Sequence, residues 1–269
     1  MRPAAASADR LRLVIGRYAV AWIYLAAVCA AELAYVLLSP HDRAALLRWA
    51  STSVHNLEHH PLASLVVSAF FPTSSLRVWP VLIALAMFGA CSVLGNWRTA
   101  LTCAAGHLLG TAVSEGIVAY RVAHGTLPPA DRFLIDVGPS YVVVAAIAVA
   151  LLHGGWLARA AAGLDLLLLI FVGQIFAGLS SLEVAAVGHL SALLSGAAVG
   201  TVLARRRRPE SALINRLRFG NLVPNIFGGT AKLELTSASF PGSRPLRAVE
   251  GSWRHLEFRG LTRLPFKAD

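Results

Sequence analysis

The stretch VGPSYVVVAAIAVALL, residues 137–152, decides the fold of this chain together with VAAVGHLSALLSGAAVGTVLA, residues 184–204. Both stretches are apolar, and each carries one reactive side chain about one helical turn after its start, Ser140 in the first and His189 in the second. A hydroxyl and an imidazole at equal depth in a bilayer are the two parts of a serine–histidine pair. The pattern predicts two membrane helices that bring Ser140 and His189 to the same end of a bundle.

The composition places the chain in the membrane class. Of its 269 residues, 56% are hydrophobic and 14% are charged, and the mean hydropathy is +0.63, which excludes a soluble domain of this size. The net charge is +10, but 13 of the 24 lysines and arginines follow Ala204. Basic residues next to a membrane helix set topology and contact anionic lipid headgroups, so we expect a lipid bilayer and no nucleic acid as a partner. The cysteines Cys29, Cys91 and Cys103 lie in apolar runs and are expected to be buried thiols.

Six apolar runs are candidates to cross about 30 Å of hydrocarbon: 18–38, 79–94, 99–120, 137–152, 164–179 and 184–204. The predicted fold class is therefore an all-α, polytopic membrane bundle of six helices. Residues 1–16 would form a cytoplasmic N-terminal segment, 17–204 the membrane domain with an external interfacial loop at 39–78, and 205–269 a basic, disordered cytoplasmic tail.

Arginines orient the predicted bundle. With the N-terminus inside, the cytoplasmic arginines are Arg2, Arg10, Arg12, Arg17, Arg98, Arg159 and those at 205–208. Those left outside are Arg43, Arg48, Arg77, Arg121 and Arg132. We therefore expect an integral plasma-membrane protein with both termini in the cytoplasm and with Ser140 and His189 near the outer face.

These residues resemble the rhomboid family of intramembrane serine proteases. The sequence Gly138-Pro139-Ser140-Tyr141 is similar to the G-x-S motif that carries the rhomboid nucleophile. Gly188-His189 looks like the start of the rhomboid histidine helix, and small residues follow it at four-residue spacing: Ala192, Gly196 and Gly200. Gly95-Asn96-Trp97-Arg98 is similar to the Gly-x-x-Arg turn after the second rhomboid span. The resemblance covers residues 17 to 204 and indicates a divergent bacterial branch.

The chain departs from the rhomboid pattern at three places. The His and Asn that donate hydrogen bonds to the oxyanion would fall near Ser75 and Trp79, and residues 76–94 contain neither residue type. Loss of one oxyanion donor costs about a hundred- to a thousand-fold in rate. Tyr141 replaces the glycine common after the serine, and Cys91 stands where a glutamate is common.

The resemblance implies an intramembrane serine endopeptidase that cuts single-span membrane proteins near their outer ends, with Ser140 as nucleophile and His189 as general base. Two alternatives stay open: a catalytically inactive relative that binds membrane helices, and a small transporter. The transporter would use three polar residues within the predicted spans: Glu32, His107 and Glu115.

Two other polar features have simpler interpretations. Asp136 precedes Ser140 by four residues and is expected to cap the helix rather than complete a triad. His55 and His59 have the spacing of a zinc pair but lack a third ligand, so we expect no metal and no cofactor.

Overall fold

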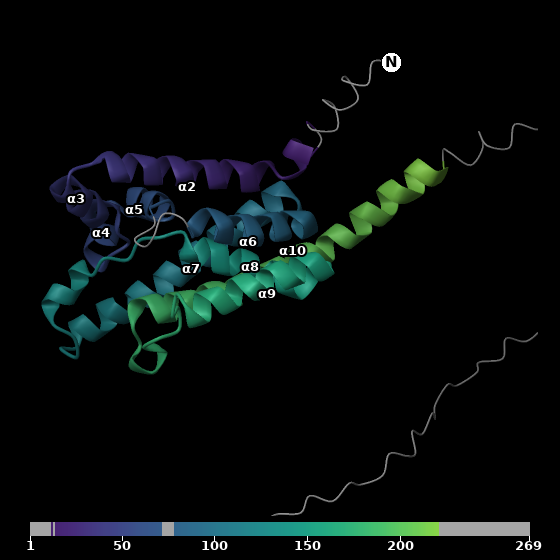
Figure 1. Ribbon diagram of the computed structural model, residues 1–269. Helices are drawn as coiled ribbons and strands as arrows, with labels where there is room; N and C mark the ends of the chain where they lie inside the picture. Colours follow the sequence, from purple (N-terminus) through teal and green to yellow (C-terminus); the bar gives the residue numbers. More distant parts are fainter. Residues whose placement is uncertain (1–11, 13, 72–77, 221–269) are drawn as a thin grey trace, which may run out of the picture. The chain divides into compact units, whose positions relative to one another are not determined.

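The computed structural model describes residue 12 and residues 14–71 and 78–220, with side chains in the last helix up to residue 206. All regular structure in this part is helical, which confirms the predicted fold class. The longer helices are α2 (Ala19–Leu37), α6 (Trp79–Leu94), α7 (Asn96–Ala123), α8 (Ser140–His153), α9 (Trp156–Phe171) and α10 (Val184–Gly220) (Figure 1). Between α2 and α6 lie α3 (Pro40–Ala50), α4 (Val54–His59) and α5 (Pro61–Ser68). Two short 3₁₀ helices follow α7 and α9: η1 (Pro129–Phe133) and η2 (Leu179–Ser181).

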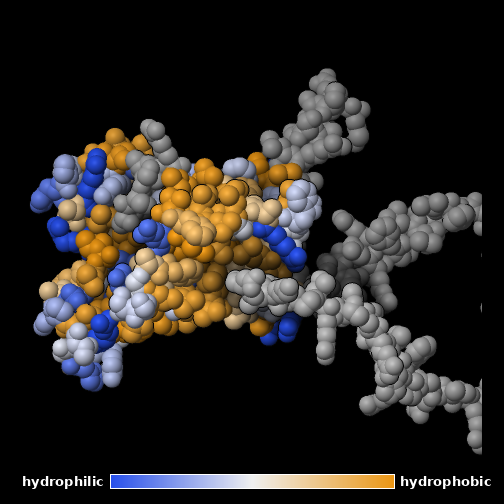
Figure 2. Space-filling view, turned by 60° about the horizontal axis from the view of Figure 1, so that its bottom comes forward, coloured by the Kyte–Doolittle hydropathy of each residue, from blue (hydrophilic) through white to orange (hydrophobic). Residues whose placement is uncertain are grey.

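The lengths of the apolar helices and the hydrophobic surface are those of an integral membrane protein. Three helical stretches are long and apolar enough to cross a bilayer: Ala19–Leu37, Asn96–Ala123 and Val184–Arg206. Helices α6 and α8 are apolar but shorter. Hydrophobic side chains cover the middle of the face shown in Figure 2, and hydrophilic side chains gather toward its ends.

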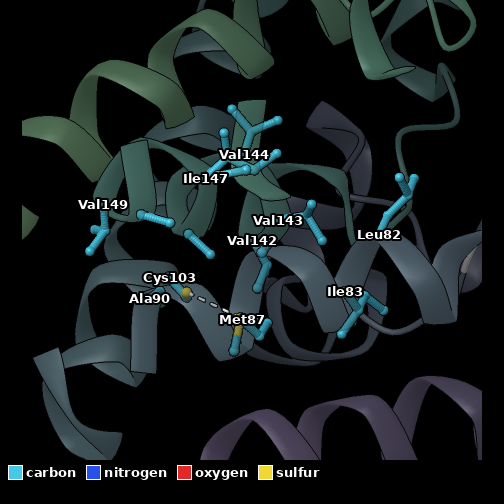
Figure 3. Close-up of a cluster of buried hydrophobic side chains, with 14 of the residues drawn as sticks. Leu82, Ile83, Met87, Ala90, Cys103, Val142, Val143, Val144, Ile147 and Val149 are labelled. Atoms are coloured by element: carbon cyan, nitrogen blue, oxygen red, sulfur yellow. Dashed lines mark hydrogen bonds between the residues drawn. The ribbon is translucent and has the colours of Figure 1, made fainter. Parts of the chain in front are cut away.

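Helix α8 is the central helix of the bundle. Residues 141–150 are all buried, and most are valine or alanine. Their side chains pack against those of α6 and α7, including Ile83, Met87 and Cys103 (Figure 3). Since the side chains of α8 are buried around the whole helix, its position is fixed by neighbours on every side rather than by an amphipathic face.

Close approach of α8 and α10 depends on glycines. A Cβ added at Gly196 would lie 2.6 Å from both the Cα and the carbonyl oxygen of Ala145, so the two backbones touch there. A Cβ at Gly200 would collide with Val149, one turn further along both helices. The small-residue groove predicted on the second stretch therefore packs on α8, and the two helices run in the same direction.

Three expectations are corrected. The fifth helix was expected at 164–179 but spans Trp156–Phe171, because glycine at 154–155 permits an earlier start and turns occupy 172–178. The tail was expected to be irregular from residue 205, yet α10 continues to Gly220, since arginine, alanine and leucine favour helix. Residues 221–269 lie outside the described part. Cys29 is exposed, because α2 is a peripheral helix with few buried residues; Cys91 and Cys103 are buried as expected.

Candidate functional site

The start of α8 is held by the segments around α4 and α5. Gly138 has φ +146°, a backbone conformation that favours glycine, and its N–H donates to the carbonyl oxygen of Ser68 at 2.9 Å. Pro139 then precedes the helix, and Ser140 is the first helical residue, half-buried. These features fix the direction in which the Ser140 side chain projects from the turn.

A second set of hydrogen bonds anchors the residues just before this turn. The N–H of Thr52 donates to the carbonyl oxygen of Asp136 at 2.9 Å, and the Thr52 hydroxyl donates to the same oxygen at 3.0 Å. The N–H of Asp136 donates to the Ser51 hydroxyl at 2.9 Å. Buried polar groups are therefore paired between the two segments, and these hydrogen bonds hold the two segments together at this end of the bundle.

Asp136 does not cap α8, contrary to the expectation, because the turn at Gly138-Pro139 places its carboxylate elsewhere. The hydroxyl of Tyr141 donates to Asp136 Oδ2 at 2.9 Å, and no side chain caps the helix. Burial raises the pKa of the Asp136 carboxyl above its ordinary value, although hydrogen bonds from Tyr141 and Thr52 oppose the shift. The carboxyl thus serves as an anchor for Tyr141.

His189 lies in the first turns of α10 and is buried. Its Nδ1 is 3.0 Å from the carbonyl oxygen of Ile175, in the segment that links α9 to α10. A carbonyl only accepts hydrogen bonds, so this distance assigns the proton to Nδ1 and leaves a lone pair on Nε2. Among the described residues, Nε2 has no hydrogen-bond partner. His189 therefore has the tautomer that a general base needs.

Tyr141 is the residue of α8 that contacts His189. The two rings meet edge-on, with centroids 5.0 Å apart and an interplanar angle of 80°. The Tyr141 side chain occupies the space that a Cβ at residue 188 would need, which explains the glycine there. No hydrogen bond joins Ser140 to His189 within the described part of the chain. The structure thus brings the predicted pair to the same end of two packed helices but leaves a tyrosine against the imidazole.

Ser140 instead lines a small void with a different imidazole, that of His107 on α7. Thr52, Ser68 and Tyr141 contribute to the same void. His107 is buried, and its Nε2 is 2.8 Å from the carbonyl oxygen of Leu65. By the argument used for His189, Nε2 carries the proton and Nδ1 is unprotonated. Nδ1 has no hydrogen-bond partner among the residues that the structure describes.

Sequence reasoning missed the roles of His107 and Tyr141. It assigned His107 only to the transporter alternative and treated Tyr141 as a departure from a motif. The available signal was weak: His107 is a polar residue after a glycine within an apolar helix, and such residues face the interior of a bundle. Neither feature indicates which side chain lies opposite.

The remaining motif residues have structural explanations. Gly95, with φ +76°, ends α6 and lets α7 begin at once, so the Gly-x-x-Arg turn needs glycine. Of the two positions at which the oxyanion donors were expected, Ser75 lies outside the described residues and Trp79 is the first residue of α6. His59 Nδ1 lies 2.8 Å from the carbonyl oxygen of His55 in its own helix, and residues 14–71 and 78–206 contain no cluster of metal-ligand type.

Comparison with protein-family models finds a match to the model described as rhomboid-like protein, over residues 14–209. No curated protein and no solved structure matches the chain. The matched range runs from just before α2 into α10 and so includes every residue of the site.

Proposed function

The chain belongs to the rhomboid-like protein family, and on that premise we propose that it is an intramembrane serine protease with Ser140 as nucleophile and His189 as general base. The observation that carries the proposal is the state of His189. Its Nδ1 is engaged by the Ile175 carbonyl, so the unpartnered Nε2 is the basic nitrogen. A buried lone pair without a donor is costly, and such groups are concentrated at functional sites.

The proposed reaction is acyl transfer. His189 Nε2 takes the proton of Ser140 as Oγ attacks a peptide carbonyl, and the imidazolium then gives that proton to the leaving amine. Water hydrolyses the acyl-enzyme, with His189 again as base. The Ile175 carbonyl accepts from Nδ1 throughout and so keeps the ring in its orientation. Backbone N–H groups at the start of α8 have no intrahelical partners and are candidate donors to the oxyanion.

The proposed substrates are single-span membrane proteins cut near the outer face. The positive charges predict that both termini are cytoplasmic, which places the first turns of α8 and α10 at the outer surface. A site at that depth can be reached by water and by the end of a substrate helix.

A decisive experiment co-expresses the protein with a panel of tagged single-span proteins and follows their cleavage. Ser140→Ala and His189→Ala should each remove nearly all cleavage, and the double variant should be little worse, because nucleophile and base act as a unit. Ser195→Ala, on α10, is the matched control: its hydroxyl only donates to the Ser191 carbonyl in its own helix, so activity should persist. Cleavage by Ser140→Ala at the parental rate would refute the proposal.

A catalytically inactive, helix-binding role is the second candidate, and the position of Tyr141 favours it. An aromatic ring packed against His189 stands where an active site needs room for substrate. If no substrate is cut by either parent or Ser140→Ala while the same single-span proteins co-purify with both, the binding role holds and the protease does not.

A further inference from the structure

A cavity of about 480 Å³ lies far from the Ser140 end of the bundle, between the start of α2 and the start of α9. Both helices pack on α6, which supplies Leu85 and Phe88 to the cavity, while α9 supplies Trp156 and Leu157. The other lining residues of α6 and α9 are alanine, glycine and Ser92, whose short side chains leave the space unfilled. The volume is typical of a small-molecule site.

The walls of this cavity suit an acyl chain. Trp156 is 77% exposed and Leu157 is 64% exposed, so in a bilayer the cavity adjoins hydrocarbon. A water molecule needs two or more polar partners, and the apolar walls offer few, whereas an acyl chain needs none. Hydrocarbon is therefore the material that fills the cavity at the lowest cost.

The residues at the helix starts mark the level of lipid headgroups. Tyr18 and Trp156 both line the cavity, and tyrosine and tryptophan concentrate at the membrane–water interface. The Arg17 guanidinium lies over the Tyr18 ring, 5.6 Å from its centroid. Arg17 is exposed and forms no ion pair with any residue that the structure describes. An uncompensated positive charge thus lies beside the apolar cavity.

This whole end of the bundle is basic. Its arginines, among residues whose side chains the structure describes, are Arg12, Arg17, Arg98, Arg159, Arg205 and Arg206. The acidic residues of α2 and α9, Glu32 and Asp165, lie well inside those helices. Basic pockets between membrane helices bind anionic lipid headgroups, so the charge at this end complements an anionic lipid rather than a zwitterionic one.

We propose that this cavity binds one anionic phospholipid, with an acyl chain between α6 and α9 and the phosphate beside Arg17. The lipid links the start of α2 to the start of α9 across α6. This site is separate from the Ser140 end, and it stands whether or not Ser140 is a nucleophile.

The test uses tryptophan quenching in the full-length protein. Nanodiscs of phosphatidylcholine receive an increasing fraction of lipid with brominated acyl chains, which quench tryptophan fluorescence on contact. The difference in fluorescence between parent and Trp156→Phe isolates the Trp156 signal. Brominated phosphatidylglycerol should quench this signal at a lower mole fraction than brominated phosphatidylcholine. Ala161→Leu, which fills part of the cavity without a change of charge, should remove that preference.

Two charge variants separate a site from the general surface potential. Arg17→Gln should raise the fraction of phosphatidylglycerol needed for half-quenching about five-fold, the factor that one basic residue near an anionic surface contributes. Arg205→Gln removes the same charge from the same end but lies on α10, which does not line the cavity, so its effect should be much smaller. Equal quenching by the two brominated lipids, or equal effects of the two variants, would overturn the proposal. Absence of quenching by either lipid would show that protein fills the cavity and would overturn it as well.

Discussion

Gly196→Ala probes the contact that aligns the two helices of the site. The new Cβ would lie 2.6 Å from the Cα and the carbonyl oxygen of Ala145, and 3.0 Å from its carbonyl carbon. Carbon atoms in contact prefer about 3.5–4.0 Å. Because the neighbouring atoms are backbone, no side-chain rotation relieves the overlap, and α10 must move away from α8 by about 1 Å.

The expected loss of stability follows from two opposing terms. Overpacking in a well-packed core costs about 1–3 kcal/mol. Alanine in place of glycine within a helix recovers up to about 1 kcal/mol. With rigid backbone on both sides the cost should fall in the upper part of its range, which leaves a net loss of about 1–2 kcal/mol.

The measurement is unfolding in mixed micelles, followed by loss of helix signal as denaturing detergent is increased. Gly116→Ala is the matched control, since no atom lies within 4 Å of a Cβ there, and α7 should gain helix propensity without a clash. It should unfold at or above the parental midpoint, and Gly196→Ala clearly below it. Equal midpoints for the two variants would refute the assigned contact of α10 with α8.

Three further predictions use other parts of the structure. Burial raises the pKa of the Asp136 carboxyl, so folding favours its neutral form. This contribution to stability is fully present below the ordinary aspartate pKa of about 4 and is lost as the pH rises through the folded-state pKa. The difference in stability between parent and Asp136→Asn should therefore change across that window and be flat below it. Asn56→Ala should lower stability by about 1–3 kcal/mol in the same unfolding assay, because its side-chain amide donates to the carbonyls at 48, 49 and 51; an unchanged midpoint would contradict that bonding. A reporter fused after Asp269 that is active only outside the cytoplasm should stay silent, and a strong signal would reverse the topology.

The fold was largely predictable because apolar length and small-residue spacing are local properties. The small residues at Gly196 and Gly200 identified the packed face of α10, and the resemblance to rhomboids implied that its partner is the helix that carries Ser140. The fifth helix was misplaced because hydropathy alone set its ends. Residues 166–171 form its most apolar run, but the helix starts at Trp156, because the break at Gly154 sets where it begins.

The site was only half predictable, because the side-chain direction at a helix start depends on the turn before it. The sequence placed Ser140 and His189 at one end of the bundle. It did not show that Gly138, tied to Ser68, would point Ser140 toward α7, nor that the next residue would take the position against His189. The first of these facts depends on a hydrogen bond between two segments about 70 residues apart in the chain, and the second on a ring contact between two helices.

The arrangement around Tyr141 bounds the rate that a protease of this design can reach. Tyr141 fills the space over Gly188, contacts His189 and donates to Asp136. To admit a substrate carbonyl between Ser140 and His189, the ring must leave, and a buried carboxyl then loses one of its two donors, at a cost of about 1–3 kcal/mol. That cost corresponds to an open state populated about 5- to 150-fold less than the closed one. The penalty slows catalysis without abolishing it, and a substrate that supplied a donor to Asp136 would cancel it. An active enzyme should therefore cleave slowly, and its Tyr141→Phe variant should cleave faster, since phenylalanine removes the hydrogen bond to Asp136 but keeps the ring. Cleavage of the same substrates at an unchanged rate in Tyr141→Phe would show that this hydrogen bond does not limit access to His189.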